Sequence, residues 1–194
     1  MSSVRKAEIE RLAELANVGA QRAAEAFAQL VGQSIEVRDS VVMQGQISVE
    51  SNIDADAGSA WSTGVFFEFE GCVDALVGIL FPGAASEALV RRIVGIESGE
   101  LAPAVIESAL MEVGNILASH VASGIADALG SRLLPSIPSL AMEDAEAAFC
   151  DLIESVLGDR ALREFARVES ALLDAAGALR GRLVLIPTHL DDES

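Results

Sequence analysis

The chain of 194 residues has a length usual for one domain, and hydrophobic residues make up 51% of it against 22% charged residues. Such a composition can bury a substantial core, which excludes an intrinsically disordered protein. Acidic residues number 30 and basic residues 13, and the net charge of −17 would repel the phosphate backbone of a nucleic acid. We therefore expect a folded protein that binds neither DNA nor RNA.

The charged residues are also uneven in kind, because Lys6 is the single lysine and every other cation is an arginine. A dense acidic surface repels itself in dilute buffer, whereas concentrated salt screens this repulsion over a few ångströms. The composition therefore suggests the hypothesis that the protein works in a saline, halophilic environment.

The first ten residues carry charges where a signal peptide needs an apolar stretch, and no apolar run approaches 18 residues. We therefore expect a cytoplasmic protein without membrane insertion. Cys72 and Cys150 have neither CxxC spacing nor a histidine cluster beside them, which indicates neither a disulfide framework nor a zinc site. We expect reduced, buried thiols and no metal bound by the chain itself.

Hydrophobic periodicity divides the first half of the chain into a long helix, a set of strands and a short helix. Apolar residues at three- and four-residue steps predict an amphipathic helix over residues 4–31, with Gly32 after its end. The strand-like segments are residues 34–43, 62–69 and 73–81, and Gly71 marks a hairpin turn between the last two. Pro82 and Gly83 end the third strand, and a short helix follows at 84–94.

The same order of elements begins again after residues 95–103, a segment with two glycines and a proline. The predicted elements are a helix at 104–129, an extended segment fixed by Pro135 and Pro138, a helix at 143–157, and strands at 161–173 and 180–187. Residues 95–103 therefore form the best junction between two halves, about 1–98 and 99–194.

The two long helices contain related segments, ELANVGA from Glu14 and EVGNILA from Glu112, 98 residues apart. Each has a glutamate followed three residues later by an asparagine, which indicates a duplication. At about 100° per residue, Glu112 and Asn115 share one narrow face of their helix, and Glu14 and Asn17 share the polar face of the other. Asparagine is a poor helix former, so its place in mid-helix in both copies suggests that a site requires the amide.

The second copy resembles the signature of the CheC, CheX and FliY phosphatases of bacterial and archaeal chemotaxis. Ser108, Glu112, Asn115 and Pro138 match that pattern, which is Asp or Ser, three residues, Glu, two residues, Asn, twenty-two residues, Pro. The segments GVFFEFEG from Gly64 and LVLIP from Leu183 are also similar to CheC. The resemblance implies one α/β (α+β) domain of pseudo-two-fold symmetry, with a mostly antiparallel sheet and two long, parallel-packed helices on one face.

The first copy departs from this signature at two positions. Glu14 and Asn17 are in place, but Glu10 stands at the Asp-or-Ser position and Ser40 at the proline position. A longer acid and the loss of a fixed φ alter the local geometry. We therefore rank the pair Glu112 and Asn115 above the pair Glu14 and Asn17.

The resemblance implies hydrolysis of the aspartyl-phosphate on phosphorylated CheY. The response regulator would supply the acyl phosphate and the Mg²⁺, so the chain needs no cofactor of its own. An asparagine amide can accept from the attacking water and donate to a phosphoryl oxygen. The glutamate beside it is suited to pairing with a lysine of the regulator.

A further partner implied by the resemblance is the receptor deamidase CheD, which docks on a helix comparable to residues 143–157. Phe149 and Asp151 are the candidate contacts, although this helix could also do no more than cap the sheet. Two other classes of function remain open. One is a non-catalytic adaptor that binds CheD or a motility component, and the other is a structural flagellar-switch component. We expect the last least, because such proteins normally carry a further strand-rich module after the second copy.

Overall fold

The computed structural model describes residues 3–45, 61–158 and 165–188. The elements, in chain order, are α1 (Ser3–Val31), β1 (Ile35–Gly45), β2 (Thr63–Gly71), β3 (Ala75–Phe81), α2 (Gly83–Val94), α3 (Pro103–Leu129), β4 (Leu133–Pro135), β5 (Ser139–Ala141), α4 (Ala145–Leu157), β6 (Phe165–Asp174) and β7 (Arg180–Pro187). They follow the predicted order closely. Residues 161–164 of the predicted sixth strand lie outside the described residues.

Glu14 with Asn17 and Glu112 with Asn115 are called the first and the second acid–amide pair. Proline and glycine set the ends of the helix that carries the second pair. Pro103 lies in the first turn of α3, where its missing N–H would have no partner within the helix. Gly130 follows the last turn with φ 62°, and its N–H donates to the carbonyls of Ala126 and Asp127. The left-handed conformation suits glycine, so the helix ends at the predicted residue.

The strands of the described residues form one antiparallel sheet of seven strands, in the order β1-β6-β7-β3-β2-β4, with β5 also paired to β2. The order reads the same from both edges when β1 is matched with β4, β6 with β2 and β7 with β3. The central pair, β3 and β7, joins the two halves, and each outermost strand pairs with a strand from the other half. This arrangement confirms the predicted pseudo-two-fold, mostly antiparallel fold class.

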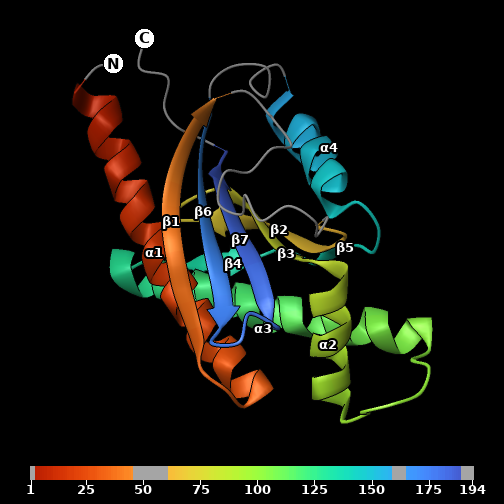
Figure 1. Cartoon of the computed structure of the whole chain (residues 1–194). Coiled ribbons are helices and arrows are strands. Elements are labelled where there is room, and N and C mark those ends of the chain that lie inside the picture. The colour runs from red at the N-terminus through yellow and green to blue at the C-terminus, as the bar shows by residue number, and fades with distance from the viewer. Residues whose placement is uncertain (1–2, 46–60, 159–164, 189–194) are drawn as a thin grey trace.

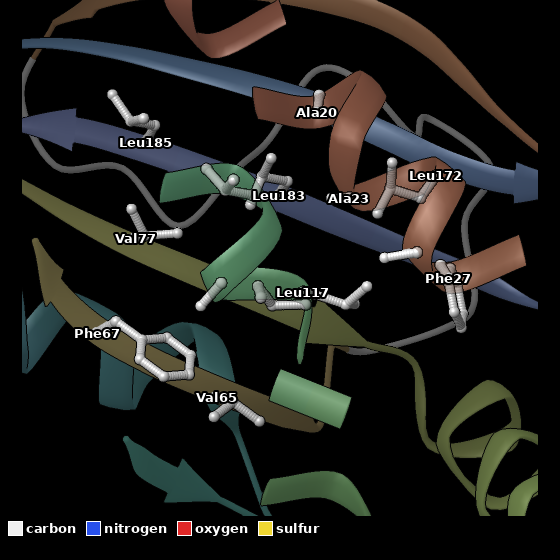
Figure 2. Packing of buried hydrophobic residues seen from close by; sticks show 14 of the residues in the cluster. Ala20, Ala23, Phe27, Val65, Phe67, Val77, Leu117, Leu172, Leu183 and Leu185 are labelled. Atoms are coloured by element: carbon white, nitrogen blue, oxygen red, sulfur yellow. The ribbon is translucent and has the colours of Figure 1, made fainter. Parts of the chain in front are cut away.

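The sheet separates two hydrophobic cores, because alternate strand residues face opposite sides. Helices α1 and α3 cover one side, where Phe27, Leu117, Val65 and Leu183 meet in the larger core (Figure 2). Helix α4 covers the other side, as Figure 1 shows. Its core includes Phe66, which alternates along β2 with Val65 and Phe67 of the first core.

Helices α1 and α3 contact each other closely, as predicted, but they do not lie parallel. In Figure 1 α1 descends steeply and α3 runs across it, so the two helices cross. Glycines make room at the contact: a Cβ on Gly19 would lie 2.9 Å from Val121 Cγ1, and one on Gly124 would lie 2.7 Å from Arg22 Cγ. These glycines therefore allow the two helices to approach closely where they cross.

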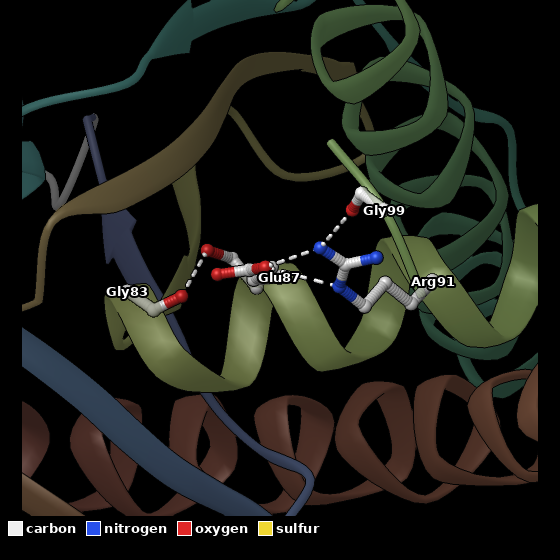
Figure 3. A network of polar contacts seen from close by, with 5 residues as sticks. Gly83, Glu87, Arg91 and Gly99 are labelled. Carbon is white, nitrogen blue, oxygen red and sulfur yellow. Dashed lines mark hydrogen bonds and ion pairs between the residues drawn. The ribbon is translucent and has the colours of Figure 1, made fainter. Parts of the chain in front are cut away.

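The predicted junction between the halves is held by one arginine side chain of α2. Arg91 donates from Nε and Nη2 to Glu87 Oε1, at 3.0 and 2.8 Å, and from Nη2 to the carbonyl of Gly99 at 2.9 Å (Figure 3). Arg91 therefore holds the segment that leads from α2 into α3.

Candidate functional site

The second acid–amide pair lies on the outer surface of α3. The Glu112 side chain is exposed and Asn115 is half-buried, whereas Leu110 and Val113 face the sheet and are buried. A spacing of three residues places the carboxylate and the amide side by side, one helical turn apart. Both groups can therefore be reached by a partner, and the buried residues of the same helix hold them in place.

Gly114 lets this part of α3 lie directly on the sheet. A Cβ at this position would come within 2.6 Å of Val65 Cγ1 and 2.8 Å of Val65 Cβ. Val65 of β2 pairs with Leu140 of β5, the strand that begins one residue after Pro138. The contact thus places the turn of α3 that precedes Asn115 over the β2–β5 pair.

Pro138 is the last residue of the segment 136–138, which separates the short strands β4 and β5 at the edge of the sheet. Ser136 holds this break to β2: its N–H donates to the Glu68 carbonyl at 2.7 Å, and its hydroxyl accepts from the Glu68 N–H at 2.9 Å. Between Ser136 and Pro138, Ile137 is 91% exposed. A proline cannot donate to a strand ladder, so β4 and β5 remain separate, short strands.

The first acid–amide pair lies on the polar face of α1, and Glu10, Glu14 and Asn17 are all exposed. Asn17 differs from Asn115 in having a side-chain neighbour on a strand, because Ser40 Oγ donates to Asn17 Oδ1 at 3.3 Å. Ser40 lies where the register of β1 with β6 shifts, between Arg38 and Val41. This bulge corresponds in the duplication to the break at Pro138.

The remaining polar groups around the two pairs do not form a metal site. No cluster of three His, Cys, Asp or Glu side chains that could hold a metal occurs in residues 3–45, 61–158 and 165–188. Ser108 and Ser119 on α3 are exposed and flank the second pair. His120 Nδ1 is 2.8 Å from the carbonyl oxygen of Ile116, one turn back in the same helix. The groups that the two pairs present on their helices are carboxylates and amides, which can form hydrogen bonds with a partner.

The two residues predicted to contact CheD have different environments on α4. Phe149 is 5% exposed and stacks on Phe66, with ring centroids 5.0 Å apart, whereas Asp151 is exposed. Phe149 thus packs in the second core and is a poor candidate for a surface contact. Ala145, Phe149, Ile153 and Leu157 recur every fourth residue, and this periodicity in the sequence indicates a buried stripe.

The cysteines are both free and half-buried. Burial raises the pKa of the Cys150 thiol, and the positive charge of Arg167 opposes this effect. The raised pKa keeps the thiol protonated near neutral pH and therefore a weak nucleophile. Cys150 lies on α4, on the other side of the sheet from the acid–amide pairs.

One hollow that sequence reasoning did not predict has a volume of about 410 Å³. It lies at the end of the β2–β3 hairpin against α4, and its lining includes Glu68, Glu70 and Asp74 together with Val156 and Leu157. Glu14, Asn17, Glu112 and Asn115 are not among its lining residues, so the acid–amide pairs take no part in it.

Comparison with known proteins identifies relatives of this chain. A model of the CheC-like family matches residues 105–141, the segment that holds Glu112, Asn115 and Pro138. The CheY-P phosphatase CheC of Bacillus subtilis is 24% identical over 197 residues, covering 97% of this chain and 91% of that protein.

Solved structures share the fold at lower identity. FliY of Thermotoga maritima is 17% identical with a TM-score of 0.68, covering 96% of this chain and 90% of that chain. CheX of Borrelia burgdorferi, solved in a complex with CheY, BeF3 and Mg²⁺, is 12% identical with a TM-score of 0.60, covering 88% of this chain and 96% of that chain.

The chain thus shares the fold of CheX and FliY, and the segment that holds its second acid–amide pair matches the CheC-like family model. None of the helices within the described ranges is long and apolar enough to cross a membrane.

Proposed function

We propose that the chain is a phosphatase that hydrolyses the aspartyl-phosphate of a phosphorylated response regulator, CheY or a close relative. The observation that carries the proposal is the position of Glu112 and Asn115. Both are accessible on one face of a helix whose opposite face is buried against the sheet. Similarity over nearly the whole chain to a CheY-P phosphatase supports the same function, and CheY would make the cytoplasm the place of action.

The reaction needs a water molecule in line with the bond that breaks. The water oxygen bonds to phosphorus as the bond from phosphorus to the regulator's carboxylate oxygen breaks, which yields inorganic phosphate and a free carboxylate. The Mg²⁺ in this proposal is held by the regulator and neutralises charge on the phosphoryl group. The chain itself would contribute position.

Asn115 and Glu112 would divide this task between them. The Asn115 Oδ1 atom accepts a hydrogen bond from the water, and its Nδ2 group donates to a phosphoryl oxygen. The Glu112 carboxylate pairs with a lysine of the regulator and fixes the depth to which α3 enters the cleft. The Gly114–Val65 contact supports both groups, because it holds this turn of α3 on the sheet.

The proposal is tested by following the decay of radiolabelled CheY-phosphate with and without the chain. Replacement Asn115→Ala should slow the stimulated rate by at least about tenfold, the lower range for loss of a positioned group at a reacting centre. Asn17→Ala should have the smaller effect.

Gln29→Ala is the matched control, because it removes an exposed carboxamide at the far end of α1. Decay that the wild-type chain does not accelerate, together with stable binding of the regulator, would contradict the proposal and favour a non-catalytic adaptor. A larger loss in Asn17→Ala than in Asn115→Ala would reverse the ranking of the two sites.

We also propose that α4 docks CheD through its exposed face. Asp151 is exposed there, whereas Phe149 belongs to the core. Asp151→Asn should therefore weaken CheD capture, measured by equilibrium binding, and leave the stability of the chain unchanged. Unchanged binding would exclude this face of α4.

A further inference from the structure

The two acid–amide pairs differ at the strand residue that accompanies each asparagine. Ser40 follows Asn17 by 23 positions, and Pro138 follows Asn115 by the same number. Ser40 lies at a bulge of the outer strand β1, and Pro138 lies in the break between the short strands β4 and β5, so both occupy an irregular point at an edge of the sheet. A bulge re-aims the side chain that it carries, and Ser40 contacts Asn17.

The Ser40 hydroxyl is anchored on its other side by a buried residue. Its Oγ lies 2.9 Å from the Oγ of Ser170, which is 1% exposed on β6. A serine hydroxyl has one proton to donate. Because Ser40 donates that proton to Asn17, it accepts from Ser170, and the three side chains form a chain of hydrogen bonds from Ser170 through Ser40 to Asn17.

This chain of hydrogen bonds acts on the atom that the proposed reaction needs. The Ser40 hydroxyl donates to Asn17 Oδ1 and holds this oxygen toward β1. It therefore competes with the attacking water, which would donate to the same atom. Pro138 has neither a hydroxyl nor an N–H, so it cannot engage Asn115 in this way. The amide oxygen of the second pair therefore has no such competitor at the corresponding position.

We propose that Ser40 restrains the first acid–amide pair, so that Asn17 positions water less well than Asn115 does. Ser40 is a positioning residue, since it acts through Asn17. The inference rests on the proposed phosphatase function and adds to it a physical cause for unequal sites. It assigns this inequality to one hydroxyl group, separately from the acid at Glu10.

The test uses an Asn115→Ala background, in which turnover reports on the first pair. Adding Ser40→Ala should raise kcat for CheY-phosphate roughly fivefold, the effect of removing about one competing hydrogen bond. KM should stay the same, because Ser40 is not proposed to touch the regulator. Ser40→Thr retains the hydroxyl and should stay at the background rate.

Two further variants separate the proposal from a general structural effect. Ser34→Ala removes an exposed hydroxyl just before β1 and should leave kcat unchanged. In Ser40→Ala alone, the buried Ser170 hydroxyl loses its partner. Ser40→Ala combined with Ser170→Ala removes both hydroxyls and should show the same rise in kcat. Thermal melting followed by circular dichroism checks that each variant is folded.

The outcomes distinguish this inference from the function on which it rests. A kcat in the Ser40→Ala variant equal to or below the background overturns the restraint while the phosphatase activity of the wild-type chain stands. A rise shared by Ser40→Thr would also overturn it, because the hydroxyl would then not be the cause. Failure of the wild-type chain to accelerate decay overturns both proposals.

Discussion

At the scale of single residues, the region around Asn115 depends on a glycine beside it. Gly114 lacks the Cβ that would meet Val65 at 2.6 Å, and this lets α3 rest on β2 next to the acid–amide pair. Glycine is a poor helix former, costing about 1 kcal/mol relative to alanine in a helix interior. Its presence in mid-helix is thus explained by packing.

Gly114→Ala should destabilise the chain despite the better helix propensity of alanine. Overpacking typically costs about 1–3 kcal/mol, and moving α3 off the sheet would also displace Asn115. Urea unfolding of Gly114→Ala, Val65→Ala and the double variant tests this. Val65→Ala makes room for the new methyl, so we expect the double variant to lose less than the sum of the two single losses. Strictly additive losses would show that the two residues do not clash.

Residue-scale prediction from the sequence worked where helical periodicity alone decides which side a residue faces. Glu112 and Glu14 reach the surface as their spacing indicates, while Leu110 and Val113 are buried. The Ser40–Asn17 contact could not be found in this way, because it depends on a register shift between β1 and β6. The CheD contact of Phe149 stays a prediction that its burial disfavours, because Phe149 belongs to the buried four-residue stripe of α4.

At the scale of elements, α4 is joined to the sheet by buried charges as well as by apolar contacts. Arg182 of β7 forms an ion pair with Glu146 of α4, lies 3.6 Å from Glu169 Oε2 of β6, and is 4.3 Å from the ring centre of Trp61. The side chains of Arg182 and Glu169 are 5% and 3% exposed. Each of these charges therefore depends on the others for compensation.

Arg182→Ala should cost about 3–5 kcal/mol of stability, because it leaves Glu169 in the interior without one of its compensating charges. Arg38→Ala is the matched control, since Arg38 pairs with Glu36 at 3.4 Å on the surface. Such exposed pairs contribute about 0–1 kcal/mol. The measurement is the free energy of unfolding in urea. Similar losses in the two variants would show that the Arg182 cluster does not stabilise α4.

Element order and boundaries were predictable because glycine and proline mark them. Pro82, Gly95 and Gly130 all lie at element ends, where the sequence placed them. The pairing of strands across the two halves was not predictable from periodicity, because alternation tells which face a residue takes and not which strand lies beside it. The close contact of α1 and α3 likewise depends on Gly19 and Gly124, whose role is visible only once the helices are in contact.

At the scale of the whole molecule, charge is the dominant feature. A net charge of −17 on 194 residues creates repulsion that the folded state must withstand. The ion pair between Arg22 and Asp127, 3.9 Å apart across α1 and α3, is too exposed to offset much of it. Dissolved cations would therefore add to the compensation that the ion pairs of the protein provide.

The melting temperature should rise as KCl is increased from about 0.1 M to molar concentration, because the Debye length falls from about 10 to 3 Å. Thermal melts at fixed pH in a KCl series measure this, and an equal osmolality of sucrose serves as the control for effects unrelated to screening. A melting temperature that did not rise with KCl would remove the support for a saline habitat.

The exchange of outer strands between the halves has a consequence for synthesis on the ribosome. Gly45 and its ladder partner Phe165 are 120 positions apart. The central strand β3 cannot form its ladder with β7 until residues 180–187 have been synthesised. A nascent chain that has emerged only as far as residue 98 therefore exposes apolar surface that no local partner can cover. Such late closure makes folding slow and leaves a window for aggregation, which chaperones guard against in the cell.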